Sequence, residues 1–106
     1  MFKMKYKIVI TTVGNKKDAQ DLAKKIVSSK LGACVQISKI KSYYSWKGNL
    51  EMSDEFRLVI KTIASKYNLL QNFILKNSKY DLPQIVSVNI SKGYNKYLRW
   101  IDGELK

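Results

Sequence analysis

Histidine is absent from the 106 residues of this chain, and several classes of site are excluded with it. Imidazole is the usual proton shuttle near pH 7 and the commonest metal ligand in proteins. Without it, no Ser/His or Cys/His catalytic pair can form. The chain also lacks the glycine-rich loop that cradles phosphates in nucleotide-binding proteins. We therefore expect a protein that is not an enzyme.

Cysteine and proline each occur once, as Cys34 and Pro83. A single cysteine allows no disulfide within the chain, which fits a reducing compartment such as the cytoplasm. The sequence has no secretory hydrophobic segment and no apolar run long enough to span a membrane, so we expect neither a signal peptide nor a membrane partner. No linker-like stretch interrupts the chain, and its length suits one domain over residues 1–106.

Acidic residues are few, because 8 Asp and Glu stand against 20 Lys and Arg, for a formal net charge of +12. Such a balance can indicate an anionic partner such as nucleic acid. However, the basic residues are nearly all lysines, dispersed along the chain in no run longer than two, whereas dedicated nucleic-acid binders concentrate charge on one face. A basic nucleic-acid-binding module is the alternative function, and we expect no sequence-specific nucleic-acid partner.

Hydrophobic periodicity predicts four strands and three helices. β-Branched and aromatic residues predict strands over 6–12, 33–46, 50–62 and 85–90. Helices are expected after Asn15, Ser65 and Asn95, each of which can act as an N-cap. The order β-α-β-β-α-β plus a terminal helix predicts an α+β, ferredoxin-like sandwich with an extended β-hairpin and a C-terminal helix, a fold that hosts many unrelated functions.

The predicted hairpin is too long for one chain of this size to cover, so its excess length must protrude or pair with another subunit. Tyr43, Tyr44 and Trp46 lie near its tip, where aromatic residues are typical of buried interfaces, although they could also form a stacking platform. Phe56 could stack a base as in RNA-recognition modules, but it alternates in phase with Leu58 and Ile60, which favours core packing.

Cys34 could be a soft-metal ligand or a reactive thiol, but its place between Ala33 and Val35 is typical of a small buried hydrophobic residue.

Five short segments, in order along the chain, resemble the sequence pattern of the CutA family. They are residues 31–35 (LGACV), 42–48 (SYYSWKG), 55–62 (EFRLVIKT), 80–85 (YDLPQI) and 97–101 (YLRWI). The resemblance implies a ferredoxin-like subunit that assembles as a homotrimer, with long hairpins reaching across neighbours, and a link to divalent-cation tolerance. It also implies small-ligand sensing in clefts between subunits, by similarity to the nitrogen-signalling PII trimers.

On this resemblance, one group of residues is expected to line the intersubunit cleft and another to form the interface. The cleft group is Cys34, Trp46, Glu55, Lys61, Tyr80 and Pro83, and the interface group is Tyr43, Tyr44, Trp46 and Trp100. In the cleft, Lys61 could hold an anion and Glu55 a cation; alternatively, the whole group serves packing and interface hydrogen bonding.

Copper binding is linked to some members of the family, and the positions that match their ligands are Thr11, Asn77 and Ser78 here. None of these is a good soft-metal ligand, and Lys79 adds positive charge beside them. We therefore expect no dedicated metal site and no cofactor, beyond weak binding of a divalent metal.

Overall fold

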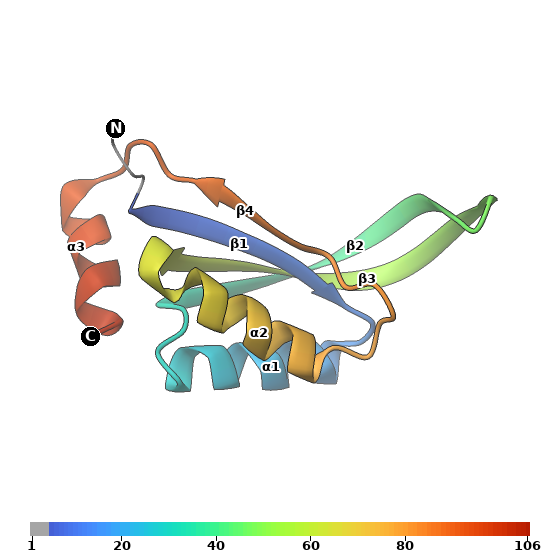
Figure 1. Ribbon diagram of the computed structural model, residues 1–106, viewed down its shortest axis with the longest axis horizontal. Coiled ribbons are helices and arrows are strands. Elements are labelled where there is room, and N and C mark those ends of the chain that lie inside the picture. Colours follow the sequence, from blue (N-terminus) through green and yellow to red (C-terminus); the bar gives the residue numbers. More distant parts are fainter. Residues whose placement is uncertain (1–4) are drawn as a thin grey trace.

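The computed structural model describes residues 5–106, which form an antiparallel sheet with helices packed against it (Figure 1). The elements are β1 (Tyr6–Val13), α1 (Lys16–Ser28), β2 (Cys34–Trp46), β3 (Asn49–Ile63), the short 3-10 helix η1 (Ala64–Lys66), α2 (Tyr67–Asn77), β4 (Ile85–Asn89) and α3 (Asn95–Glu104). The sheet order is β2-β3-β1-β4. The predicted α+β, ferredoxin-like fold is therefore confirmed.

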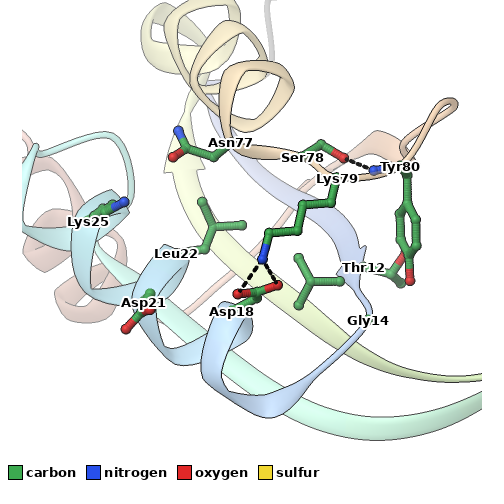
Figure 2. A pocket seen from close by; sticks show the side chains of 11 residues that line it. Thr12, Gly14, Asp18, Asp21, Leu22, Lys25, Asn77, Ser78, Lys79 and Tyr80 are labelled. Carbon is green, nitrogen blue, oxygen red and sulfur yellow. Dashed lines mark hydrogen bonds and ion pairs between the residues drawn. The ribbon is translucent and has the colours of Figure 1, made fainter.

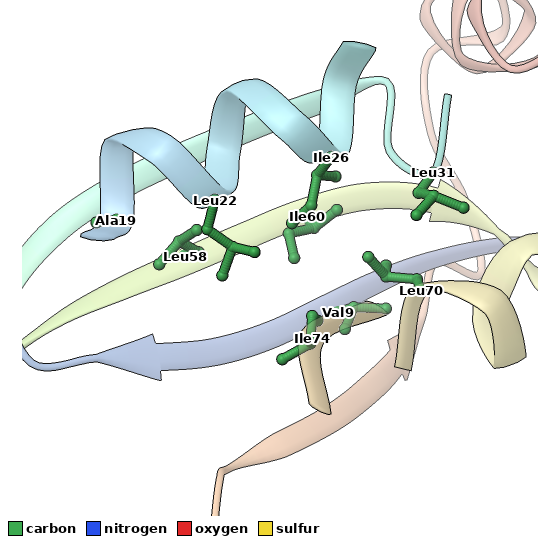
Figure 3. Packing of buried hydrophobic residues seen from close by; sticks show 9 residues of the cluster. All are labelled: Val9, Ala19, Leu22, Ile26, Leu31, Leu58, Ile60, Leu70 and Ile74. Carbon is green, nitrogen blue, oxygen red and sulfur yellow. The ribbon is translucent and has the colours of Figure 1, made fainter. Parts of the chain in front are cut away.

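Helices α1 and α2 cover one face of the sheet and bury the main hydrophobic core against it (Figures 1 and 3). Strand residues Val9, Leu58 and Ile60 point into this layer, where Ile26 of α1 and Leu70 of α2 meet them. All five side chains are fully buried. The alternation along β3 that predicted one buried face thus corresponds to the face under the helices.

The opposite face of the sheet is left largely uncovered. Side chains alternate between the two faces along a strand, so Ile8 and Ile10, on either side of buried Val9, point to this side. Cross-strand partners share a face, so Val88 opposite Ile8, and Val86 and Val59 opposite Ile10, also lie on it. We call these five residues the open face. Val86 and Val88 are 46% and 54% exposed. Helix α3 covers only the end beside Tyr6 and Ile63, where Ile101 and Leu105 pack.

The β2–β3 hairpin extends well beyond the rest of the fold (Figure 1). Strand β1 pairs with β3 only as far as Val13, opposite Phe56, so residues 49–55 of β3 pair with β2 alone. At the tip, Lys47 and Gly48 both have positive φ, 51° and 81°, which is the conformation of a two-residue type I′ turn. The surplus length expected of this hairpin is therefore present as a protruding arm.

Of the three predicted N-caps, only Asn15 is confirmed: its side chain accepts a hydrogen bond from the backbone N–H of Asp18. Ser65 lies inside η1, and α2 begins at Tyr67 without a side-chain cap. Asn95 is the first residue of α3 and not its cap. Both of these predictions are wrong because a cap requires extended backbone at that position, which a residue type alone does not guarantee.

Candidate functional site

A groove of about 790 Å³ runs between the base of the hairpin arm and the chain that follows α2. This volume lies within the range of small-molecule sites, roughly 300–1,000 Å³. Its walls come from β1, β2, β3 and the segment before β4, through Thr12, Lys41, Ser42, Tyr43, Tyr44, Ser45, Trp46, Glu55, Tyr80, Asp81, Leu82 and Gln84. Residues far apart in the sequence therefore meet in one concave surface.

Glu55 and Tyr80 form the floor of this groove. The Tyr80 hydroxyl donates a hydrogen bond to Oε2 of Glu55 across 2.8 Å. Glu55 is only 8% exposed, so this donor compensates a carboxylate that is largely removed from water. Burial, followed by the hydrogen bond to Glu55 and the charge of that carboxylate, raises the pKa of the Tyr80 hydroxyl. The phenol is thus held in its neutral, donating form.

Tyr80 lies close to the end of β1. Gly14 follows β1, and a Cβ on this residue would lie 3.5 Å from the Tyr80 hydroxyl. On the other side of the ring, the backbone N–H of Tyr80 donates to Ser78 Oγ across 3.1 Å, which fixes the turn after α2. The phenol is therefore positioned by the hydrogen-bonded turn that carries Tyr80 and by its own bond to Glu55.

Aromatic side chains from the arm make up one wall of the groove. Tyr44 donates to or accepts from Ser53 Oγ at 2.8 Å, which fixes its ring against β3. The ammonium of Lys47 lies 5.9 Å from the centre of the Trp46 ring, a cation–π arrangement. The groove thus joins a carboxylate floor to an aromatic wall.

The charge in the groove is opposite to that of the whole chain. Glu55 and Asp81 are acidic, while Lys41 is the only basic residue of the lining and forms an ion pair with Asp54 at 3.2 Å. The chain as a whole carries a formal charge of +12. With two carboxylates and one lysine that is already paired, the described lining of the groove is acidic, within a strongly basic chain.

A smaller pocket of about 170 Å³ lies on the other side of Tyr80, between the start of α1 and the end of α2 (Figure 2). Lys79 closes it, because its ammonium contacts the two carboxylate oxygens of Asp18 at 3.0 and 3.2 Å. This contact lowers the pKa of Asp18. Tyr80 and Thr12 line both cavities, so the two are separated by little more than one ring.

The three positions that match the family's copper ligands are not assembled into a metal site. Asn77 and Ser78 line the smaller pocket, whereas Thr11 is buried within β1 and does not reach it. Across residues 5–106, no group of three or more His, Cys, Asp or Glu side chains is placed to hold a metal ion. The donor set present therefore does not fit a resident transition metal.

The predicted cleft residues fall into two groups within one subunit. Trp46, Glu55 and Tyr80 line the groove, and Pro83 lies in the segment that borders it without lining it. Cys34 and Lys61 lie directly opposite each other on β2 and β3, at the far end of the sheet. Six residues of strand separate Lys61 from Glu55, a distance of about 20 Å.

Lys61 and the predicted interface residue Trp100 lie on either side of Tyr97 of α3. The Lys61 ammonium donates to Gln36 Oε1 at 2.8 Å and lies 5.8 Å from the centre of the Tyr97 ring. Tyr97 in turn stacks on Trp100, with ring centres 5.5 Å apart. Trp100 is partly exposed, as are the other predicted interface residues, Tyr43, Tyr44 and Trp46 on the arm.

Sequence reasoning missed several residues of the groove, above all Thr12, Lys41 and Asp81. Asp81 follows Tyr80 directly, so its position in the segment 80–85 was a usable signal. Thr12 and Lys41 carry no such signal, since their place depends on how far the arm extends beyond β1.

The profile of the family described as "CutA1 divalent ion tolerance protein" matches residues 7–104 of this chain. The divalent-cation tolerance protein CutA of Archaeoglobus fulgidus is 31% identical over 97 residues, which are 92% of this chain and 95% of that protein. The chloroplastic protein CutA of Arabidopsis thaliana is 38% identical over 95 residues, 89% of this chain. The chain spans only 52% of the length of that plant relative.

Solved structures agree with these matches. The structure of CutA1 from Oryza sativa superposes with a TM-score of 0.93 at 36% identity, covering 97% of this chain and 95% of that one. The structure described as the periplasmic divalent cation tolerance protein CutA of Archaeoglobus fulgidus gives a TM-score of 0.93 at 30% identity, covering 95% and 99%. No helix within residues 5–106 is both long and apolar enough to cross a membrane.

Proposed function

This chain belongs to the CutA1 family of divalent ion tolerance proteins, and from that premise we propose that it works as a homotrimer that binds a small ligand in clefts beside its hairpin arms. In this proposal the bound ligand, and not a catalysed reaction, links the protein to the response to metal ions. The observation that carries the proposal is the pairing of an uncovered apolar sheet face with a concave groove at its edge.

The open face supports assembly. A sheet buried on one side only usually carries polar residues on the other side. Here the part of that side around β1 and β4 presents the apolar open face, while Arg57, Lys61 and Gln36 lie on the part formed by β3 and β2. Contiguous apolar surface of this kind marks an interaction site. A protruding arm with aromatic residues near its tip is suited to reach onto a neighbouring copy.

Assembly would also complete the cleft. One subunit keeps Glu55 and Tyr80 at one end of its sheet and Cys34 and Lys61 at the other. In a closed ring of identical subunits, each interface joins two different surfaces, so the end of the sheet with Glu55 and Tyr80 in one copy meets another part of the next copy. We propose that the two groups face each other there, with Pro83 shaping the bordering loop. The free thiol of Cys34 fits a reducing compartment, which we propose to be the cytoplasm.

Light scattering tests the assembly. We expect a mass about three times the 12.3 kDa of the chain, unchanged at high salt, because apolar burial is not screened by ions. Val88→Lys, which places a charge on the open face, should dissociate the trimer. The matched control is Val27→Lys on the outer surface of α1, where valine is 45% exposed. A wild-type monomer at micromolar concentration contradicts the proposal.

A further inference from the structure

Glu55 is a largely buried carboxylate without a cationic partner. None of the ion pairs among residues 5–106 includes it, and its hydrogen bond comes from the neutral hydroxyl of Tyr80. That bond uses Oε2 and leaves Oε1 without a protein partner in the groove lining. Oε1 itself is not buried, so a positively charged group that enters the groove can reach it directly.

We propose that the groove binds a small organic cation, an alkylated or primary ammonium group that sits against Glu55 and the aromatic wall. This inference rests on the proposed small-ligand function and names the chemical class of that ligand. It separates the ligand of the groove from the metal ions of the family's name.

The donor set argues against a metal ion in the groove. Structural and catalytic zinc sites use at least three protein ligands, and calcium takes six to eight oxygens. The groove lining supplies the carboxylates of Glu55 and Asp81, hydroxyls and aromatic rings, with no thiol or imidazole. No cluster of three acidic, cysteine or histidine side chains exists within residues 5–106.

The charges argue against an anion. An anionic ligand would approach the Glu55 carboxylate at the floor and Asp81 at the rim. The lysine in the lining, Lys41, is already paired with Asp54 at 3.2 Å. The Tyr80 hydroxyl already donates its one hydrogen bond to Glu55, so it has no donor left for an incoming anion.

The aromatic wall favours an ammonium group. Tyr and Trp rings attract cations over their faces. Trp46 shows this property already, because the ammonium of Lys47 lies 5.9 Å from its ring centre. An organic ammonium can contact Tyr44 and Tyr80 through its alkyl groups while its charge faces Glu55. A hydrated metal ion has no such apolar surface. Trp46 lies opposite Asn49, six positions along β3 from Glu55, so only an extended cation such as spermidine can reach both.

Isothermal titration calorimetry on the full chain tests this with matched probes. The cations are choline, tetramethylammonium and spermidine. The three controls are phosphate, Zn²⁺ and 3,3-dimethylbutan-1-ol, the last of which is the uncharged isostere of choline. We expect at least one of the cations to bind, and choline to bind about tenfold or more tightly than its isostere. Equal binding of choline and its isostere, or binding of none of the three cations at millimolar concentration, overturns the inference.

Variants locate the site. Glu55→Gln keeps the shape of the side chain and should weaken cation binding about tenfold or more, whereas Glu51→Gln, an exposed carboxylate on the same strand outside the groove, should not. Trp46→Leu, at a partly exposed position on the arm, should weaken binding of the extended cation spermidine. Unchanged binding in both Glu55→Gln and Trp46→Leu refutes the site. Light scattering on each variant distinguishes failure of this inference from failure of the proposed function. If an intact trimer binds phosphate or zinc, only the ligand class is refuted. If the wild-type protein is a monomer, the proposed function is refuted.

Discussion

Tyr80 and Glu55, 25 residues apart in the sequence, are joined by a 2.8 Å hydrogen bond from the phenolic hydroxyl to Oε2 of the carboxylate. This bond connects the segment after α2 to β3 at the point where the hairpin leaves the sheet. It therefore sets both the floor of the groove and the position of its border. Among the described residues no lysine pairs with Glu55, so the carboxylate adds its charge to the groove.

Removing the hydroxyl should destabilise the fold. Tyr80→Phe leaves the buried Glu55 carboxylate without its donor, which costs about 1–3 kcal/mol of unfolding free energy. Urea denaturation measures the change. The control is Tyr94→Phe, at a tyrosine that is 70% exposed, where we expect no change beyond error. Equal midpoints for the two variants would show that water replaces the bond without loss.

The pKa of Tyr80 gives a prediction for alkaline pH. Its folded pKa is raised above the unfolded value of about 10, by burial first and by the bond to Glu55 second. A raised pKa contributes stability that is fully present below pH 10 or so and is lost as the pH rises towards the folded value. Tyr80→Phe removes this dependence, so its free energy of unfolding should fall less steeply than the wild type between pH 9 and 11 or thereabouts. If the unfolding free energies of the two proteins fell in parallel with pH, the raised pKa of Tyr80 would be contradicted. Tyr6, whose pKa is also raised, is present in both proteins, so its contribution cancels in the comparison.

Much of the fold could be predicted because periodicity and turn chemistry are local. The pattern of β3 around Leu58 and Ile60 identified the buried face, and the gap between the predicted strands 33–46 and 50–62 matches the turn at Lys47 and Gly48. N-caps were less predictable. Asn15 has extended backbone, with φ −149° and ψ 163°, and caps α1, whereas Ser65 falls in η1 because the chain tightens into a 3-10 turn before α2 begins.

The candidate site was predictable only in part, because it depends on contacts that the sequence does not encode locally. The family resemblance placed both Glu55 and Tyr80 in the cleft. Their hydrogen bond, however, depends on the path of the chain after α2. Cys34 and Lys61 were placed in the same cleft, yet they lie at the other end of β3 in one subunit. A site shared between subunits cannot be derived from the pattern of a single chain.

Two buried threonines on neighbouring strands make a matched pair for stability. Thr11 on β1 is 1% exposed and its hydroxyl has no hydrogen-bond partner among residues 5–106. Thr62 on β3 is fully buried, and its hydroxyl donates to the Leu31 carbonyl at 2.7 Å. Threonine and valine have nearly the same shape. Thr11→Val should therefore stabilise the protein by about 1 kcal/mol, and Thr62→Val should destabilise it by about 1–2 kcal/mol.

Chemical denaturation of the two valine variants decides this prediction. Opposite signs are expected from the same substitution, so general effects of losing a hydroxyl cancel in the comparison. A loss of stability in Thr11→Val would mean that its hydroxyl is satisfied in solution, for example by a water molecule bound beside β1.

Copper binding should be weak, and Cys34 should contribute little to it. A tight soft-metal site needs several converging S or N donors. The chain supplies one cysteine, three methionines and no histidine. Met52 lies on the exposed arm, in β3 opposite Tyr43 of β2. Cys34 is the first residue of β2, at the end far from the arm. Met1 and Met4 are outside the described residues. We expect Cu(II) calorimetry on untagged protein to show no stoichiometric binding at low micromolar concentration, and Cys34→Ala to leave both the isotherm and the proposed trimer unchanged. Submicromolar binding of one Cu(II) per subunit that disappears in Cys34→Ala, with Met52→Leu as the control that retains it, would contradict this. It would mean that assembly brings donors from different subunits together around the thiol, because one subunit alone does not offer them within residues 5–106.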